Sequence, residues 1–151
     1  MIETFGAYEL DDDPERIDAD AVWDFLSTEA YWGRERVRAD FDAQLASAWR
    51  VVGAYETATG RQVGFARAIS DGVAFGYLSD VYVLAEARGA GLGKGLVAMT
   101  VDRGAGAGFR WGLHTSDAHG LYRQYGFVEP ADGRYLERPP VSAGQEADPP
   151  H

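Results

Sequence analysis

The spacing of apolar positions along this chain switches between the period of a helix and that of a strand. From Asp18 to Ser27 apolar residues recur at helical spacing behind an aspartate that can cap the first turn, and from Arg34 to Trp49 they recur every fourth residue. Between residues 50 and 83 the period shortens, and glycine-containing turns interrupt it at Thr57–Gly60 and Asp71–Gly72. This pattern predicts two helices followed by three hairpin-linked strands, Arg50–Glu56, Arg61–Ser70 and Val73–Val83.

Weaker patterns flank this centre. Phe5–Leu10 is expected to be a first strand, ended by a turn at Asp11–Pro14. After residue 91 the expected elements are a helix at Leu92–Arg103 that ends at Gly104–Gly108, a strand at Phe109–Thr115, a short helix at Asp117–Tyr125, and strand material at Gly126–Val128 and Arg134–Glu137. The order predicts one α/β domain over residues 1–138 with a mixed, mostly antiparallel sheet, since hairpins precede one crossover. Residues 139–151 are rich in proline, serine and acids, and are expected to be a disordered tail.

The composition narrows the class of protein. With 151 residues, 46% of them hydrophobic, the chain suits one domain with a real core. Its net charge of −10 argues against a nucleic-acid partner, which needs a basic face, and suits either a cationic amine ligand or solubility alone. There is no cysteine, which excludes disulfides and a cysteine nucleophile. No apolar run is long enough for a membrane and no signal pattern opens the chain, so a cytoplasmic protein with no membrane partner is expected.

The most informative motif is the run Arg88-Gly89-Ala90-Gly91-Leu92-Gly93, between a predicted strand and a predicted helix. Alternate glycines let backbone N–H groups crowd around one anion, and a helix N-terminus favours a phosphate. The Walker A pattern fails, because Gly95 stands where serine or threonine is needed, and the Rossmann pattern lacks its third glycine. The motif therefore predicts a phosphate-bearing ligand, with a turn that binds nothing as the alternative.

Two segments resemble one known family. Arg88, Gly91 and Gly93 match the acetyl-CoA loop of the GCN5-related N-acetyltransferases (GNAT), Arg/Gln-x-x-Gly-x-Gly/Ala, although Ala85 stands where many members have proline. Residues Asp117–Phe127 are similar to the family segment Ala-x-x-Leu/Phe-Tyr-x-x-x-Gly-Phe. The resemblance implies an acetyltransferase fold in which the fourth and fifth strands splay apart and acetyl-CoA enters the gap.

The same resemblance implies where acetyl-CoA binds. The main-chain groups of Val81 and Val83 are expected to pair with the pantetheine arm as an added strand would. The phosphates are expected to lie against Arg88, Gly89, Gly91, Gly93 and Lys94.

Two side chains are candidates for the chemistry. Tyr122 falls on the family tyrosine that lies near the CoA sulfur, and a phenol of pKa about 10 can protonate a thiolate whose conjugate acid lies near about 8.5. An amine of pKa about 10.4 must lose a proton before it attacks, and Asp80, which shares its strand parity with Leu78 and Tyr82, is the candidate base. The alternatives are packing of Tyr122 on the sheet and a strand-edge or loop-bonding role for Asp80. Without cysteine or a Gly-x-Ser-x-Gly motif, direct transfer in a ternary complex is expected.

The acceptor amine is expected to bind at the link between the first two helices and at the short helix near the C-terminus. The candidate substrate-binding residues are Tyr31, Trp32, Arg34 and His119. Core packing explains Trp32 equally well, and a structural role explains His119. Asp117 is expected to cap the short helix. His114 and His119 lack a metal-ligand pattern, so no metal is expected.

The predicted function is acetyl-CoA-dependent N-acetylation of a primary amine on a small molecule or peptide. Tyr31–Arg34 together with Asp117–Tyr122 also resembles a bacterial subgroup of small acetyltransferases without a settled substrate. A homodimer is compatible with this interpretation. The alternatives are a non-catalytic CoA-binding sensor or regulatory module, and an enzyme that uses a larger acyl donor.

Overall fold

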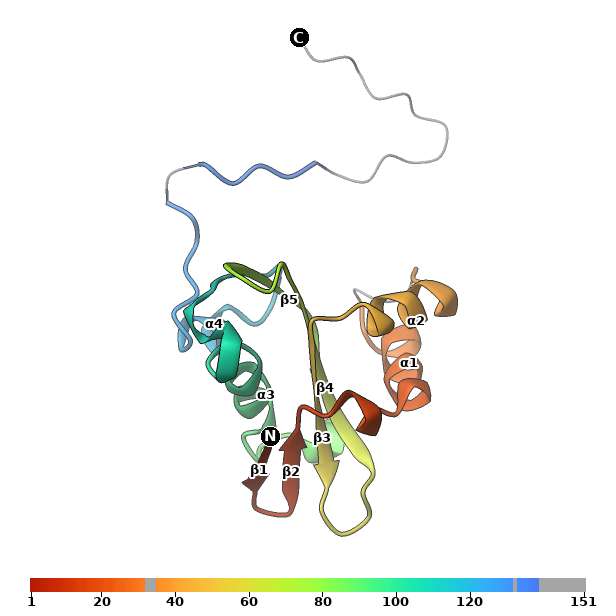
Figure 1. Cartoon of the computed structure of the whole chain (residues 1–151). Coiled ribbons are helices and arrows are strands. Elements are labelled where there is room, and N and C mark those ends of the chain that lie inside the picture. Colours follow the sequence, from red (N-terminus) through yellow and green to blue (C-terminus); the bar gives the residue numbers. More distant parts are fainter. Residues whose placement is uncertain (32–34, 132, 139–151) are drawn as a thin grey trace.

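The fold is built on a single six-stranded sheet (Figure 1). This computed structural model describes residues 1–31, 35–131 and 133–138. The strands lie in chain order: β1 (Ile2–Phe5), β2 (Tyr8–Asp11), β3 (Arg50–Glu56), β4 (Gln62–Ser70), β5 (Phe75–Val83) and β6 (Arg110–Gly112). Neighbouring strands pair antiparallel except for β5 and β6, which pair parallel. The mixed, mostly antiparallel sheet predicted from the sequence is therefore confirmed.

Helices cover both faces of this sheet (Figure 1). On one face lie α1 (Ala19–Thr28) and α2 (Arg38–Ala46), and on the other lies α3 (Leu92–Val101), with α4 (His119–Arg123) beside it. Within the described residues, three short 3-10 helices occupy connections: η1 (Pro14–Arg16), η2 (Ala85–Ala87) and η3 (Gly104–Gly108). The side chain of Asp18 accepts a hydrogen bond from the Ala21 N–H, so the predicted cap of the first helix is present.

Each face of the sheet has its own hydrophobic core. The core under α3 consists of Leu10, Val52, Ala54, Val63, Ala66, Ala87, Leu92, Leu96 and Met99. The core under α1 and α2 consists of Val22, Phe25, Leu26, Ala30, Phe41, Val51, Phe65 and Tyr82. Gly95 allows α3 to lie close to the β1–β2 hairpin, because a Cβ there would stand 2.7 Å from both Leu10 Cδ1 and Phe5 Cζ.

A β-bulge in β5 changes which side chains share a face. Arg67 of β4 is opposite Asp80, but the next residue, Ala68, is opposite Leu78, so Ser79 is the extra residue. As a result Leu78 packs with α3, whereas Asp80 and Tyr82 face the α1 side. The expectation that Leu78, Asp80 and Tyr82 lie on one face is therefore wrong, because one inserted residue reverses the alternation.

Other elements differ in extent from the prediction. Residues 5–10 do not form one strand, because Gly6 adopts φ +59° and turns the chain between β1 and β2. The second helix ends at Ala46 rather than Trp49, whose N–H donates to the Ala68 carbonyl at the end of β4. In the C-terminal region β6 spans only residues 110–112, α4 begins at His119, and residues 126–128 and 134–137 form no strand. The tail predicted at 139–151 lies outside the described residues.

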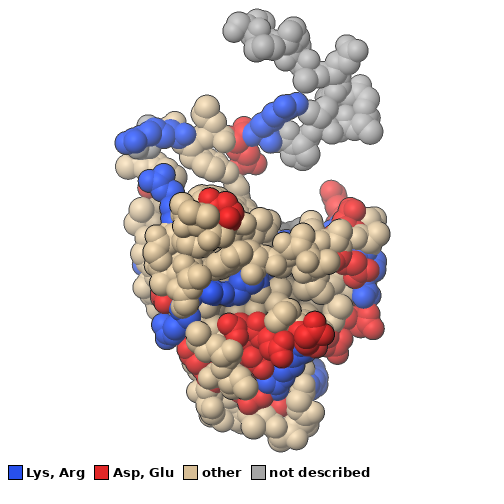
Figure 2. Space-filling view, viewed as in Figure 1, with Lys and Arg blue, Asp and Glu red and all other residues tan. Residues whose placement is uncertain are grey.

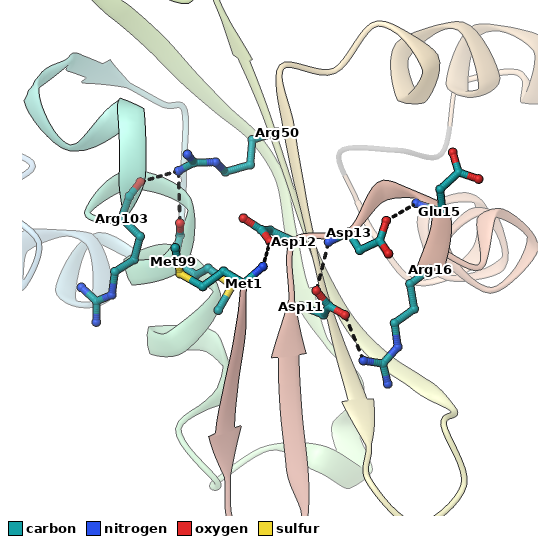
Figure 3. Close-up of polar contacts among 9 residues, drawn as sticks. All are labelled: Met1, Asp11, Asp12, Asp13, Glu15, Arg16, Arg50, Met99 and Arg103. Atoms are coloured by element: carbon teal, nitrogen blue, oxygen red, sulfur yellow. Dashed lines mark hydrogen bonds and ion pairs between the residues drawn. The ribbon is translucent and has the colours of Figure 1, made fainter.

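The acidic turn after β2 is held by its own side chains. Asp11 accepts a hydrogen bond from the Asp13 N–H and pairs with Arg16 at 3.1 Å, and Asp13 caps η1 by accepting from the Glu15 N–H (Figure 3). Figure 2 shows the acidic side chains gathered over this part of the surface. The turn predicted at Asp11–Pro14 thus leads directly into η1.

Arg50 ties β3 to the C-terminal end of α3 (Figure 3). Its Nη1 donates to the carbonyls of Thr100 and Arg103 at 2.8 and 2.7 Å, where a helix leaves backbone carbonyls without partners. Burial lowers the pKa of this guanidinium, which remains charged at neutral pH. A cation at this end also complements the helix dipole.

Candidate active site

The cleft begins where β5 and β6 separate. Their parallel pairing ends at Tyr77 and Gly112, and β5 continues to Val83 without β6 beside it. A cleft of about 580 Å³ opens along this part of β5. Its walls come from β5, the glycine loop, the segment after β6 and α4, together with residues of α1 and the segment that follows it. The predicted splay between the fourth and fifth main strands is therefore present, as the β5–β6 separation.

The cleft gathers most of the described residues that the sequence singled out. Those that line it are Tyr31, Asp80, Val81, Val83, Arg88, Gly93 and Tyr122. Four others do not line it: Gly89, Gly91, Lys94 and His119. His119 is an exposed residue in the first turn of α4. Trp32 and Arg34 lie outside the described residues.

The backbone of β5 presents polar groups to the cleft. The Leu84 N–H donates to the Val63 carbonyl at 2.8 Å, on the β4 side. Because successive N–H groups along an extended strand point to opposite sides, those of Val81 and Val83 point away from β4 and toward the cleft. Their side chains pack against the core under α3. The backbone arrangement suits an extended ligand that pairs with the strand edge.

The glycine loop joins β5 to α3 through two left-handed residues. Gly89 has φ +89° and Gly91 has φ +84°, a conformation that side chains with a Cβ rarely adopt. Gly91 is the N-cap of α3, and a Cβ built at either glycine would meet nothing within 4 Å. The backbone conformation therefore requires these glycines, and the space above them is open to a ligand at a helix N-terminus.

Arg88 and Lys94 hold different positions around this loop. Arg88 lines the cleft, and its Nε donates to the Val83 carbonyl at 3.1 Å. Lys94 is exposed on α3, and its carbonyl accepts a hydrogen bond of 2.8 Å from the Tyr125 hydroxyl. Tyr125 therefore ties the end of α4 to α3. Of the two predicted cations, only Arg88 is placed directly at the cleft.

Asp80 is buried and held by two arginines that the sequence did not connect with it. Each terminal nitrogen of Arg36 lies 3.0 Å from one carboxylate oxygen, and Arg67 Nε lies 2.9 Å from Oδ2. Desolvation alone would raise the pKa of Asp80, but the hydrogen bonds and charges of the two arginines outweigh it and hold this pKa below its ordinary value. Such a carboxylate is a weak proton acceptor, so the geometry weighs against the base role and favours a structural one.

Tyr122 reaches the cleft from α4. Its ring is half-buried and meets Phe127 edge-on, with ring centroids 5.8 Å apart. Burial, followed by the charge of Asp117, raises the pKa of Tyr122, so its phenol carries a proton at neutral pH. The predicted cap of this helix is wrong, because the N-cap residue is Ala118 and no side chain makes a capping hydrogen bond there. In the turn that precedes the helix, Thr115 Oγ1 accepts a hydrogen bond of 3.1 Å from the Ala118 N–H. Asp117 instead lines the cleft.

Sequence reasoning considered His114 only as a metal ligand and did not place it in this cleft. Tyr77 and His114 both line it, and the Tyr77 hydroxyl lies 2.5 Å from His114 Nδ1. The opposite ring nitrogen, Nε2, lies 3.1 Å from a carboxylate oxygen of Glu137. In the sequence His114 falls inside a predicted strand, and its partners are 37 and 23 residues away, so no local pattern marked it. Among the described residues, no group of three or more His, Cys, Asp and Glu side chains is placed to hold a metal ion.

Comparison with known proteins assigns the family. Residues 47–129 match the family model described as acetyltransferase (GNAT) domain. The chain belongs to the GNAT acetyltransferase family. A crystal structure of a protein assigned to this GNAT family, from Xanthomonas campestris pv. campestris, is 34% identical, has a TM-score of 0.83, and is matched over 91% of this chain and 96% of that chain. The family resemblance carried by the glycine loop and the Tyr122 segment is thus confirmed.

Two further proteins show how far the similarity extends. A crystal structure of a protein described as an acetyltransferase, from Deinococcus radiodurans R1, shares the fold, with a TM-score of 0.64 at 20% identity over 90% of this chain and 92% of that one. A Gibberella zeae protein named as an acetyltransferase is 41% identical over 76 residues, which are 50% of this chain and 41% of that protein. The match thus spans less than half of that fungal relative.

No helix among the described residues of this GNAT protein has the length and apolar character to cross a membrane.

Proposed function

We propose that this GNAT protein is an acetyl-CoA-dependent N-acetyltransferase that moves an acetyl group directly to a primary amine of a small molecule or peptide. The observation that carries the proposal is the meeting of three features at one cleft. These are the free edge of β5, the glycine loop at the N-terminus of α3, and the Tyr122 side chain on α4. Together they suit an extended ligand with an anionic end and a reacting centre near a phenol.

The residues of the cleft fit acetyl-CoA. The cleft-facing N–H groups of Val81 and Val83 suit the amide-bearing pantetheine arm, as they would an added strand. The left-handed glycines and the N-terminus of α3 suit the pyrophosphate, with Arg88 as the adjacent cation. When bound, acetyl-CoA supplies an activated acetyl thioester.

Tyr122 is the proposed proton donor of the transfer. Its raised pKa keeps the proton on Oη until the sulfur of CoA takes up negative charge. The chain has no cysteine to form an acyl-enzyme, which supports direct attack by the amine. The acceptor amine must reach the thioester as the neutral base, so a second group has to take up its proton.

Two measurements test this function. Acetyl-CoA is incubated with the protein and pooled small amines, amino acids and peptides, with CoA release followed and acetylated products identified by mass spectrometry. Calorimetry measures acetyl-CoA affinity in the wild type and in Arg88→Ala. We expect an N-acetylated product, and weaker, less salt-dependent binding in the variant, since a cation near the phosphates is lost. Acetyl-CoA binding without any acetylated product would instead favour the CoA-binding regulatory module.

A further inference from the structure

We propose that Tyr77, His114 and Glu137 form a proton relay that takes the proton from the acceptor amine. This inference rests on the proposed function, for which it supplies the missing base. Its basis is a continuous line of hydrogen bonds that begins in the cleft, where Tyr77 lies, passes through His114, and ends at Glu137.

The partners of His114 define what each ring nitrogen does. Nε2 faces the Glu137 carboxylate at 3.1 Å, and a carboxylate can only accept, so Nε2 carries the proton. Nδ1 is then the acceptor of the 2.5 Å hydrogen bond from the Tyr77 hydroxyl. This leaves the lone pairs of Tyr77 Oη available to a donor in the cleft, such as an amine.

The relay is better suited to the proton than the carboxylates of the cleft. Histidine is the side chain that most often acts as a general base, because imidazoles as a class accept a proton closer to neutral pH than carboxylates do. Proton transfer is most effective when the accepting group titrates near the working pH. Asp80, in addition, is bound on both oxygens by arginine.

The proton step balances within the three side chains. One N–H bond of the ammonium breaks, and its proton goes to Tyr77 Oη while the original hydroxyl proton of Tyr77 goes to His114 Nδ1. The amine keeps its electron pair for attack, and His114 becomes an imidazolium paired with Glu137. The His114 side chain is 54% exposed, so the proton can then pass to water.

Other charged and titratable groups also face this relay. Tyr135 Oη lies 3.5 Å from His114 Nε2, on the same side as Glu137, and the charge of Asp80 acts on Tyr77 from within β5. Burial, together with the nearby Tyr135, Glu137 and Asp80, raises the pKa of Tyr77. A tyrosine in this state transmits a proton and does not hold a negative charge at neutral pH.

The pH dependence of kcat in single variants tests the relay. In His114→Gln we expect kcat at neutral pH to fall by about 10²–10⁴-fold and to rise steadily with pH, since only hydroxide or water then takes the proton. Tyr77→Phe should lose a similar factor. Glu137 acts as a positioning residue, so Glu137→Gln should lower kcat less and shift the pH profile. Acetyl-CoA affinity, measured by calorimetry, should stay constant in all three.

Two controls separate the relay from general damage. Glu129→Gln removes an exposed carboxylate whose partner is Arg123, and should leave the profile unchanged. In His114→Ala, free imidazole should restore part of the rate, which a purely structural role would not allow. Wild-type kinetics in either His114→Gln or Tyr77→Phe would overturn the relay while the N-acetyltransferase function stands. A wild-type protein that acetylates no amine would overturn the proposed function, and the relay with it.

Discussion

At the scale of single residues, Tyr122 offers the sharpest test of the chemistry. Tyr122→Phe keeps the edge-on packing against Phe127 and removes only the proton donor. We expect kcat to fall by about 10²–10⁴-fold, toward the low end because a thiolate leaves well unaided. Acetyl-CoA affinity should hardly change, since the loss lies in the chemical step. Wild-type rates at saturating acetyl-CoA, with chemistry shown to be rate-limiting, would remove the acid assignment.

Asp80 gives a prediction about stability. Asp80→Asn leaves the buried Arg67 and the nearly buried Arg36 without their carboxylate, and breaking such a pair typically costs about 3–5 kcal/mol. Urea unfolding should report a loss of this size. The matched control is Asp42→Asn, which breaks an exposed pair with Arg38 and should cost less than about 1 kcal/mol. Equal, small losses in both variants would show that Asp80 does not anchor the sheet.

At the scale of elements, a substitution where the glycine loop meets α3 can distinguish an effect on acetyl-CoA binding from an effect on stability. Gly91→Val places a β-branched side chain at φ +84°, which strains the backbone and blocks the phosphate side of the loop. Gly60→Val is the matched control, since Gly60 has φ +73° and open space around it, but lies in the β3–β4 turn. Both variants should lose stability, on the order of 1–2 kcal/mol. Calorimetry should show a loss of acetyl-CoA affinity only in Gly91→Val, and an equal affinity in both would contradict the phosphate site.

At the scale of the whole molecule, the stability of the fold is expected to depend on pH through Asp80. An aspartate in the unfolded chain has a pKa of about 3.9. The pKa of Asp80 in the folded protein lies below this value. The contribution of Asp80 to the free energy of unfolding is therefore complete when the pH is above the unfolded-state pKa. This contribution is lost as the pH falls through the folded-state pKa. We expect the urea midpoint to fall as the pH is lowered below about 4. Asp80→Asn should weaken this dependence, Asp42→Asn should keep it, and an identical acid dependence in Asp80→Asn would show that other carboxylates carry it.

The sequence by itself determined the family, the order of most main elements and the position of the glycine loop between a strand and a helix. These depend on local patterns: apolar period, alternate glycines and a short tyrosine motif can each be recognised within about ten residues. The first strand was predicted less well, because Gly6 turns a six-residue run into a hairpin. The second helix was predicted too long, because Trp49 hydrogen-bonds to β4, a tertiary partner that periodicity does not report.

Only the tertiary structure decided the surroundings of the candidate catalytic groups. Arg36 meets Asp80 across 44 residues, and Glu137 meets His114 across 23, so neither pair leaves a trace in local spacing. The bulge at Ser79 changes which side chains of β5 share a face of the sheet. Side chains alternate between the two faces, so one extra residue moves the residues beyond it to the opposite face. Long-range packing thus surrounded the candidate base Asp80 with two arginines and brought His114 into the cleft, because a side chain's charge state depends on which distant groups the fold places beside it.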